Sequence, residues 1–584
     1  MAVSEETFDF VIVGSGGGSM CAALVHAMGK KALILEKTDL FGGTTSRSGG
    51  MMWIPNNRFM AEDGAPDSPE QALAYMNAAI GPAEDIRSAA PDKRLAYIDE
   101  APRMIDFLVE QGIRLQRFGG WPDYYSALPG GSEVGRSVIA ELFDANELGE
   151  MKTLLRPNYL PMPAKLEEAM KVPHAGTGMA GKIAMLKIGL RMFTQKLFGK
   201  DYVANGAALQ GRMLKRALEV GVDMRANAAV ERLVTDDSGA VRGVVARIDG
   251  KAVTFTARDG VLVNAGGFAR NQAMRDKYQP GTNADWSNAI PADTGEMIEE
   301  MMRIGAATEI MEEFAGNQMA LVPEKPEIHN MVMQELAKPY SIVVDQTGAR
   351  YLREVQSYMQ FCQEVYARDK IAPAVPSWLV MERRYVERYM VAGSLPGSKK
   401  PQAWYDSGFL GKADTLEDLA NKCGMDRATL LASVERFNQL ARTGEDVDFR
   451  RGSNAYNRYW GDHTLGLPNP NMAPLEQGPF YAYRVYPGDI GTWGGVVPDA
   501  RARVLREDGT PIPGLYATGT SAASFMGRRY LGPGASVGPS FTWGYVAAKH
   551  ALNADNRACG AENPAGRIAL AGQSKQEEGQ GNRR

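Results

Sequence analysis

The sequence predicts a mixed α/β fold in which a parallel-sheet domain is interrupted by an inserted α+β domain. Three apolar, strand-like segments that end in glycine turns support this prediction, at residues 8–19, 260–267 and 515–519. One lies at the N-terminus and another near the C-terminus. The chain between them must therefore leave the first domain and return to it.

The inserted domain is predicted from residues 290–480, which have a pattern of their own. Helices are expected over 296–305 and 416–443, and a strand over 341–345. Ligand sites usually lie between domains, so we expect the active site in the cleft between these two. The expected boundaries are 1–288 and 485–560 for the two parts of the first domain, 289–484 for the inserted catalytic domain, and 561–584 for a polar, disordered tail.

The N-terminal segment has the pattern of a Rossmann-like dinucleotide-binding unit. A strand at 8–13 is followed by a glycine-rich turn, a helix and a second strand that ends at Glu36, where a ribose contact is expected. Gly14 makes the tight turn, and Gly16 lets the backbone approach a pyrophosphate at the helix N-terminus. Ser19 replaces the third glycine of the motif and is small enough for close helix–strand packing.

The segments that follow favour FAD over NAD. Residues 37–50 resemble the segment along the flavin in the fumarate reductase and succinate dehydrogenase flavoprotein superfamily, and residues 260–267 and 515–519 resemble its returning FAD contacts. Covalent members carry a histidine where this chain has Thr45-Ser46-Arg47-Ser48, so the resemblance implies non-covalent FAD. The motif and the resemblance together imply FAD contacts at Gly14, Gly16, Gly17, Ser19, Glu36, Lys37, Gly42, Gly43, Thr44, Ser48, Gly49, Gly50, Ala265, Gly266, Gly267, Gly519, Ser536 and Val537.

The segment Tyr530-Leu531-Gly532-Pro533-Gly534 lies between the last strand and an apolar helix. A phenol and a glycine amide four residues later can place two hydrogen-bond donors on one ligand oxygen, which would favour enolisation of a ketone. The alternative is a simple turn with an aromatic residue leading into it.

Residues 7–552 resemble the bacterial 3-ketosteroid Δ1-dehydrogenases, which remove hydrogen across carbons 1 and 2 of a 3-keto steroid. The resemblance implies that Tyr530 and the Gly534 amide bind the 3-keto oxygen and that Tyr358 is the general base. It also implies that Tyr124 assists Tyr358, with the adjacent Tyr125 as the alternative. The sequence departs from the family at Trp493 and Leu531, which puts the preferred steroid in doubt more than the reaction.

These residues are consistent with a complete reaction. Tyr530 and Gly534 would polarise the ketone, Tyr358 would take the proton from carbon 2, and hydride would pass from carbon 1 to flavin N5. A free phenol has a pKa of about 10, so Tyr358 is expected to need a hydrogen bond from Tyr124 or a nearby positive charge.

Composition limits the partners and the location. A formal charge of −4 argues against nucleic acid, and the five histidines are dispersed without a metal-ligand pattern. The four cysteines lack disulfide spacing, the first residues do not read as a signal peptide, and no apolar run is long enough to span a membrane. We expect a cytoplasmic enzyme that uses an external electron acceptor, with association with the inner membrane face as an option.

That option rests on residues 182–200, which carry five basic residues and no acidic one. This segment is either a helix packed on the domain, with its apolar stripe buried, or a helix in a membrane interface near anionic headgroups. The stripe at helical spacing consists of Ile183, Leu186, Leu190, Phe193 and Leu197.

Three other functions stay open from the sequence. The first is reduction of an activated double bond, for which Arg528 and Arg529 are present but the expected histidines are missing. The second is steroid dehydrogenation at carbons 4 and 5. The third is a non-catalytic flavin- and lipid-binding protein. The sequence does not specify the steroid side chain, the electron acceptor or the oligomeric state.

Overall fold

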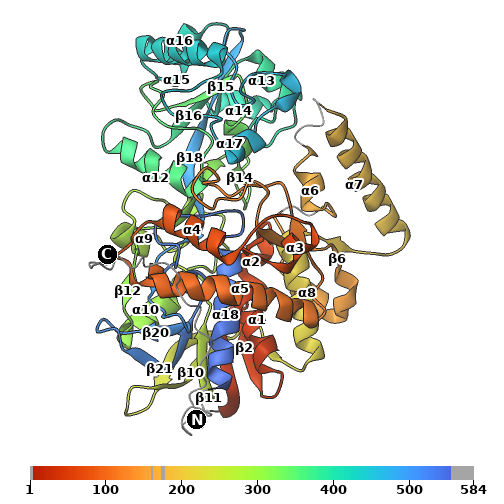
Figure 1. Cartoon of the computed structure of the whole chain (residues 1–584), viewed down its shortest axis with the longest axis vertical. Helices are drawn as coiled ribbons and strands as arrows, with labels where there is room; N and C mark the ends of the chain where they lie inside the picture. Colours follow the sequence, from red (N-terminus) through yellow and green to blue (C-terminus); the bar gives the residue numbers. More distant parts are fainter. Residues whose placement is uncertain (1–3, 160–161, 173–177, 554–584) are drawn as a thin grey trace, which may run out of the picture.

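A computed structural model describes residues 4–159, 162–172 and 178–553, so the expected tail at 561–584 lies outside the described residues. Both ends of the chain contribute to one eight-stranded sheet (Figure 1). Strand β1 pairs in parallel with β2 and β11, and β11 pairs in parallel with β21. The ordered path β20-β21-β11-β1-β2-β8 consists of β20 (Arg503–Leu505), β21 (Pro511–Ala517), β11 (Lys251–Val263), β1 (Ser4–Val13), β2 (Ala32–Leu35) and β8 (Asp223–Arg225), with β9 (Ala229–Thr235) and β10 (Val241–Ile248) beside it.

Helices bury the faces of this sheet. Helix α1 (Gly17–His26) packs along α18 (Val537–Leu552), and glycines allow this close approach. A Cβ at Gly18 would meet the backbone of Ser540, and a Cβ at Gly544 would meet the backbone of Gly18. Strand β2 is buried throughout, as expected for a parallel sheet covered on both faces. The prediction of a Rossmann-like α/β domain is confirmed.

The inserted residues form a second, six-stranded sheet, which is antiparallel. Its strands are β13 (Phe314–Ala320), β14 (Asn330–Met331), β15 (Ser341–Val344), β16 (Ser377–Met381), β17 (Leu410–Ala413) and β18 (Phe480–Thr492). The expected domain boundary at residue 484 therefore falls inside β18. The predicted helix over 296–305 is α10 (Glu296–Arg303).

The single helix predicted over 416–443 is wrong in one respect. The segment forms two helices, α15 (Leu416–Cys423) and α16 (Arg427–Thr443). Gly424 ends the first in the left-handed region, with φ of 74°, and Asp426 begins the second by accepting a hydrogen bond from the Thr429 amide. Both features are local signals of a helix end and a helix start.

Helix α7 (Met179–Leu197) covers the basic segment and projects from the side of the molecule next to α6 (Leu166–Ala169) (Figure 1). The buried residues of α7 are the small Gly181 and Ala184 and the apolar Ile188. The interpretation with a buried apolar stripe is wrong, because the side chains of that stripe are exposed, with Leu186 at 72% and Phe193 at 66%. Among the described helices, none is long and apolar enough to cross a membrane.

Candidate active site

A cavity of about 1080 Å³ lies where the two sheets meet. Its walls include the glycine turns after β1 and β11 and, from the inserted segment, residues of β13, β14 and α12 (Tyr358–Asp369). All four candidate catalytic residues line it: Tyr124, Tyr358, Tyr530 and Gly534.

Three phenol rings form a compact cluster in this cavity. The ring centroid of Tyr358 lies 5.3 Å from that of Tyr124 and 4.7 Å from that of Tyr530. The Tyr530 hydroxyl also lies 3.0 Å from the Ser536 hydroxyl. Tyr125, the alternative to Tyr124, does not line the cavity. Of the two neighbouring tyrosines, Tyr124 is therefore the one whose position allows contact with a ligand in the cavity.

Two contacts hold the Tyr530 segment against its neighbours. The Leu531 carbonyl accepts hydrogen bonds from the Tyr124 amide at 3.0 Å and from the Tyr75 hydroxyl at 2.6 Å, which ties two cluster segments together. Trp493 stacks on Tyr530 with centroids 5.0 Å apart, and its indole donates to the Gly527 carbonyl at 2.8 Å. Trp493 and the Leu531 carbonyl thus contact residues of the cluster directly.

Gly534 has a backbone conformation that suits glycine alone, with φ of 93°. A Cβ at this position would lie 2.5 Å from the carbonyl carbon and oxygen of Met51. Its own carbonyl accepts from Trp53, whereas no described residue accepts a hydrogen bond from its amide. The amide is therefore available to a ligand oxygen beside Tyr530.

Burial controls the acidity of the cluster. It raises the pKa of Tyr358 well above its usual value, and the neighbouring Tyr124 and Tyr530 hydroxyls raise this pKa further. In the protein alone, Tyr124 therefore does not favour the Tyr358 phenolate, and the expected need of Tyr358 for help is greater. The cause is desolvation, which disfavours a buried anion.

This raised pKa predicts an alkaline pH profile. A base must be deprotonated to act, and below its pKa the phenolate fraction grows about tenfold per pH unit. We expect kcat/KM for a 3-ketosteroid to increase with pH from 7 to 9, with a slope near one on logarithmic axes. Steady-state rates, with circular dichroism as a check on folding, would test this. A profile flat from pH 7 to 9 would contradict the assignment of an unassisted phenol as base.

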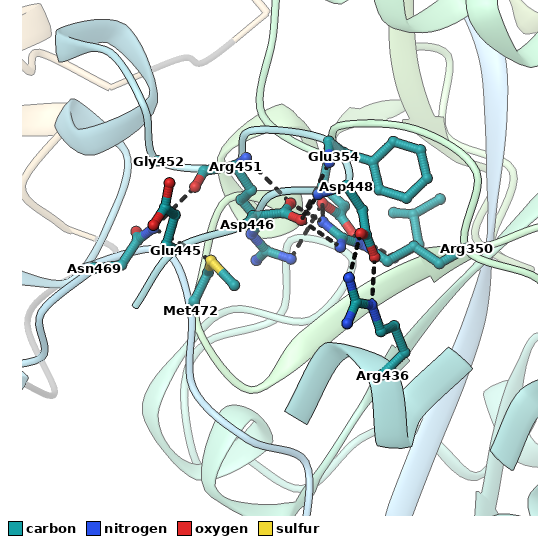
Figure 2. Close-up of polar contacts among 12 residues, drawn as sticks. Arg350, Glu354, Arg436, Glu445, Asp446, Asp448, Arg451, Gly452, Asn469 and Met472 are labelled. Atoms are coloured by element: carbon teal, nitrogen blue, oxygen red, sulfur yellow. Dashed lines mark hydrogen bonds and ion pairs between the residues drawn. The ribbon is translucent and has the colours of Figure 1, made fainter. Parts of the chain in front are cut away.

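A buried ion network fixes the segment that leads to Tyr358 (Figure 2). Arg350 donates to Glu354 at 2.7 Å and to Asp446 at 2.6 Å, and Arg451 lies 3.4 Å from Glu354. Burial opposes ionisation of Glu354, but the two guanidinium groups more than offset it, so its pKa lies below the usual value. The network joins the Tyr358 segment to the loop at 446–451.

Removing one charge from this network should destabilise the fold. In Glu354→Gln, Arg350 and Arg451 lose a buried counter-charge, which typically costs about 3–5 kcal/mol. Urea unfolding would measure the loss. Asp448→Asn is the matched control, because its pair with Arg436 is solvent-exposed and should change the midpoint little (Figure 2). Equal midpoints for Glu354→Gln and the wild type would show that the network does not stabilise the protein.

The other end of the cavity fits a dinucleotide. Gly16 is the N-cap residue of helix α1 and provides no side-chain cap, and the first turn has no acidic residue, so the N-terminus of this helix can receive an anion. A Cβ at Gly14 would overlap the backbone of Asn264, which explains the glycine. The Glu36 carboxylate lines the same region and is held by Ser15 and Thr38.

Most of the predicted cofactor residues line this cavity, but four do not. Gly17 packs against Phe541, and the Ser19 hydroxyl accepts a hydrogen bond from the Asn264 side chain. Gly42 lies against Ser46, and Gly267 lies against Thr492. These residues shape the turns around the cavity. The lining set is Gly14, Gly16, Glu36, Lys37, Gly43, Thr44, Ser48, Gly49, Gly50, Ala265, Gly266, Gly519, Ser536 and Val537.

Sequence reasoning missed several lining residues. Asp293 is buried before α10, its Oδ1 has no hydrogen-bond partner among the described residues, and burial raises its pKa to about 7. A single acid in a loop carries no sequence pattern that would have revealed it. The cavity also has a methionine-rich wall, with Met162, Met170, Met331, Met333 and Met390 from separate segments.

Comparisons with known proteins support a flavin site in this cavity. Residues 9–537 match the FAD binding domain family, so the protein is a flavoprotein of that class and binds FAD. The chain is 37% identical over 566 residues to a 3-oxosteroid 1-dehydrogenase of Mycolicibacterium smegmatis, covering 94% of this chain and 97% of that protein.

Two further relatives are informative. A 4-oxocyclohexanecarboxylate 2-dehydrogenase of Sinomonas cyclohexanicum is 34% identical, with 93% of each chain covered. The crystal structure of 3-ketosteroid delta1-dehydrogenase from Sterolibacterium denitrificans, in complex with 1,4-androstadiene-3,17-dione, superposes with a TM-score of 0.88 at 36% identity, covering 94% of this chain and 100% of that one. The chain belongs to the 3-oxosteroid 1-dehydrogenase family.

Proposed function

We propose that this protein catalyses the FAD-dependent 1,2-dehydrogenation of 3-ketosteroids. The observation that carries the proposal is the convergence of Tyr124, Tyr358, Tyr530 and Gly534 on a cavity whose other end fits a dinucleotide. The family relationship supports it, since a related enzyme of known structure holds a steroid dienone.

Each group has a defined task in this proposal. The Tyr530 hydroxyl and the Gly534 amide donate hydrogen bonds to the 3-keto oxygen and stabilise the negative charge that develops there. Tyr358, in its phenolate form, accepts the proton from carbon 2 and becomes the phenol, and Tyr124 orients the Tyr358 oxygen. FAD, held without a covalent bond, supplies the acceptor for the hydride that leaves carbon 1. An external electron acceptor then completes the cycle.

The cavity does not suit fumarate-type chemistry. Arg528 and Arg529 are absent from its lining. Arg528 is 42% exposed and pairs with the surface carboxylates Asp85 and Glu312. Neither arginine is therefore positioned to hold a dicarboxylate beside the tyrosines.

Anaerobic mixing with 4-androstene-3,17-dione tests the function directly. The proposal predicts that flavin absorbance bleaches and that the 1,4-diene is released. Loss of hydrogen at carbons 4 and 5 from a saturated 3-ketosteroid, without 1,4-diene formation, would instead support the alternative dehydrogenation. Bound FAD that no 3-ketosteroid reduces would favour a binding protein.

We also propose that α7 docks on an anionic bilayer. Its outward face presents Leu186, Leu190 and Phe193, and the exposed Lys182, Lys187 and Lys196 have no acidic partner among the described residues. Exposed apolar side chains flanked by basic ones match the boundary between acyl chains and anionic headgroups. Arg191 fastens α7 to α6 through hydrogen bonds to Glu168 at 2.6 and 2.9 Å.

Vesicle flotation tests this docking. The wild type should float with phosphatidylglycerol-containing vesicles and less so at high salt, whereas Leu186→Glu/Phe193→Glu should stay in solution. Ile371→Glu is the control, since Ile371 is an equally exposed apolar residue remote in sequence. Equal flotation of the wild type and a deletion of 182–200 would overturn the proposal. So would a dimer that the double variant converts to a monomer, because a second copy would then cover α7.

A further inference from the structure

Asn317 is a polar side chain in the middle of a buried strand. It lies on β13, which is buried along its whole length, and the residue itself is only 2% exposed. Successive side chains of a strand point to opposite faces, so Ala315 and Asn317 share one face, and both line the cavity. The Asn317 side chain therefore belongs to the wall that the inserted sheet contributes to the cavity.

The protein does not satisfy the Asn317 amide group. Its Oδ1 has no hydrogen-bond partner among the described residues. Asn288, which also lines the cavity, differs, because its Nδ2 donates to the His329 carbonyl at 3.0 Å and its Oδ1 accepts from the His329 amide at 2.8 Å. A buried polar group without a partner is costly, and an apolar side chain of similar size would avoid that cost. The position suits a residue whose partner arrives with a ligand.

Strand β13 leads away from the tyrosine cluster. Its first residue pairs with Thr492, which precedes the Trp493 that stacks on Tyr530. Asn317 pairs with Gly488 and lies three residues further along β13, about 10 Å at the rise of a strand. A rigid fused nucleus whose ring A is held by the tyrosine cluster must extend into the rest of the cavity. Asn317 then lies beside the rings that are remote from ring A.

The cofactor turns adjoin the start of β13 instead. The Thr492 hydroxyl accepts a hydrogen bond from the Phe268 amide at 3.4 Å, directly after the glycine turn at 266–267. Gly488, the partner of Asn317, lies four residues before Thr492, about 13 Å away along β18. This separation favours the steroid over the cofactor as the partner of Asn317.

We propose that Asn317 forms a hydrogen bond with an oxygen substituent on ring C or ring D of the steroid and so selects oxygenated nuclei over those that lack such a group. An amide donates through its nitrogen and accepts through its oxygen, so it suits a hydroxyl as well as a ketone. A steroid without this oxygen leaves the amide unpaired, and a site built to hydrogen-bond a substrate group rejects the analogue that lacks it. The inference rests on the proposed function, because ring A must lie at Tyr530 and Gly534 for the other rings to reach Asn317.

A series of substrates tests this selection. It compares 4-androsten-3-one, whose only oxygen is the 3-keto group, with its 11β-hydroxy, 12α-hydroxy and 17β-hydroxy derivatives. We expect at least one derivative to exceed the parent steroid in kcat/KM by about tenfold or more, the effect of one buried hydrogen bond. Equilibrium binding, followed through flavin absorbance, should show the same order. The inference is overturned if no derivative exceeds the parent in either measurement.

Asn317→Leu locates the selection at this residue. It removes the amide with little change in volume and should reduce the ratio between the preferred derivative and the parent to near one. Gln318→Met is the matched control and should keep the wild-type ratio. Gln318 follows Asn317 on β13, is equally buried and also has an unpaired side-chain oxygen among the described residues, but it does not line the cavity. It points to the opposite face of β13, where Gly316 lies against Cys362 of α12.

The other outcomes are distinguishable. Equal losses for every steroid in Asn317→Leu would overturn the inference, and weaker FAD binding in this variant would assign Asn317 to the cofactor instead. Absence of flavin reduction by every steroid in the series would refute the proposed function. The binding order in the wild type and in Asn317→Leu would still show whether Asn317 contacts the steroid.

Discussion

Tyr358→Phe is expected to lower kcat/KM for 4-androstene-3,17-dione by about 10²–10⁴-fold, the usual contribution of a general base. The substitution removes the oxygen that, as the phenolate, would accept the carbon-2 proton, and it leaves the ring packing of the cluster in place. FAD binding should be kept, because the phenol lies among tyrosines and not at the glycine turns. Rapid mixing should show that flavin reduction, and not steroid binding, is impaired.

Tyr125→Phe is the matched control. Tyr125 is the neighbour of Tyr124, has a buried hydroxyl and does not line the cavity. Its loss should change kcat/KM by less than a factor of about 3, since no reacting atom is within reach. Turnover of Tyr358→Phe close to that of the wild type would exclude the role assigned to Tyr358.

Gly534→Ala should also lower kcat/KM, by about 10²–10³-fold. A Cβ would lie 2.5 Å from the Met51 carbonyl, so the backbone must shift and the amide must leave its position beside Tyr530. Loss of one donor to a developing oxyanion typically costs about 10²–10³-fold. Binding of the product dienone, followed by flavin absorbance, should weaken together with the rate.

Gly29→Ala controls for the general cost of replacing a glycine. A Cβ at Gly29 would contact no other atom within 4 Å, and this residue lies outside the cavity. The control should keep wild-type activity. Full activity in Gly534→Ala would mean that the amide does not bind the substrate oxygen.

Local sequence patterns predicted the parts of the fold that depend on local chemistry. Gly14 stands at a strand–helix turn where a Cβ would overlap the Asn264 backbone, and a Cβ at Gly16 would crowd the Asn264 side chain, so the glycine pattern is visible in the sequence. Gly424 and Asp426 are residue types that commonly end and begin helices, but the apolar pattern continues across them and favours a single helix.

Other features depend on packing between distant segments. The apolar stripe of α7 has the period of a buried helix, and only the tertiary structure shows that its small residues face the protein instead. The raised pKa of Tyr358 follows from burial by residues far away in the chain. The methionine-rich wall combines β14, the segment after α6 and the turn at 390–395, so no single stretch of sequence encodes it.

A crystal structure of the FAD-bound protein with 1,4-androstadiene-3,17-dione would test the central claim most directly. We predict that the 3-keto oxygen lies within about 2.6–3.2 Å of both the Tyr530 hydroxyl and the Gly534 nitrogen, with Tyr358 facing carbon 2. A dienone bound with its 3-keto oxygen away from these two donors, or with Tyr358 against another carbon, would contradict the account.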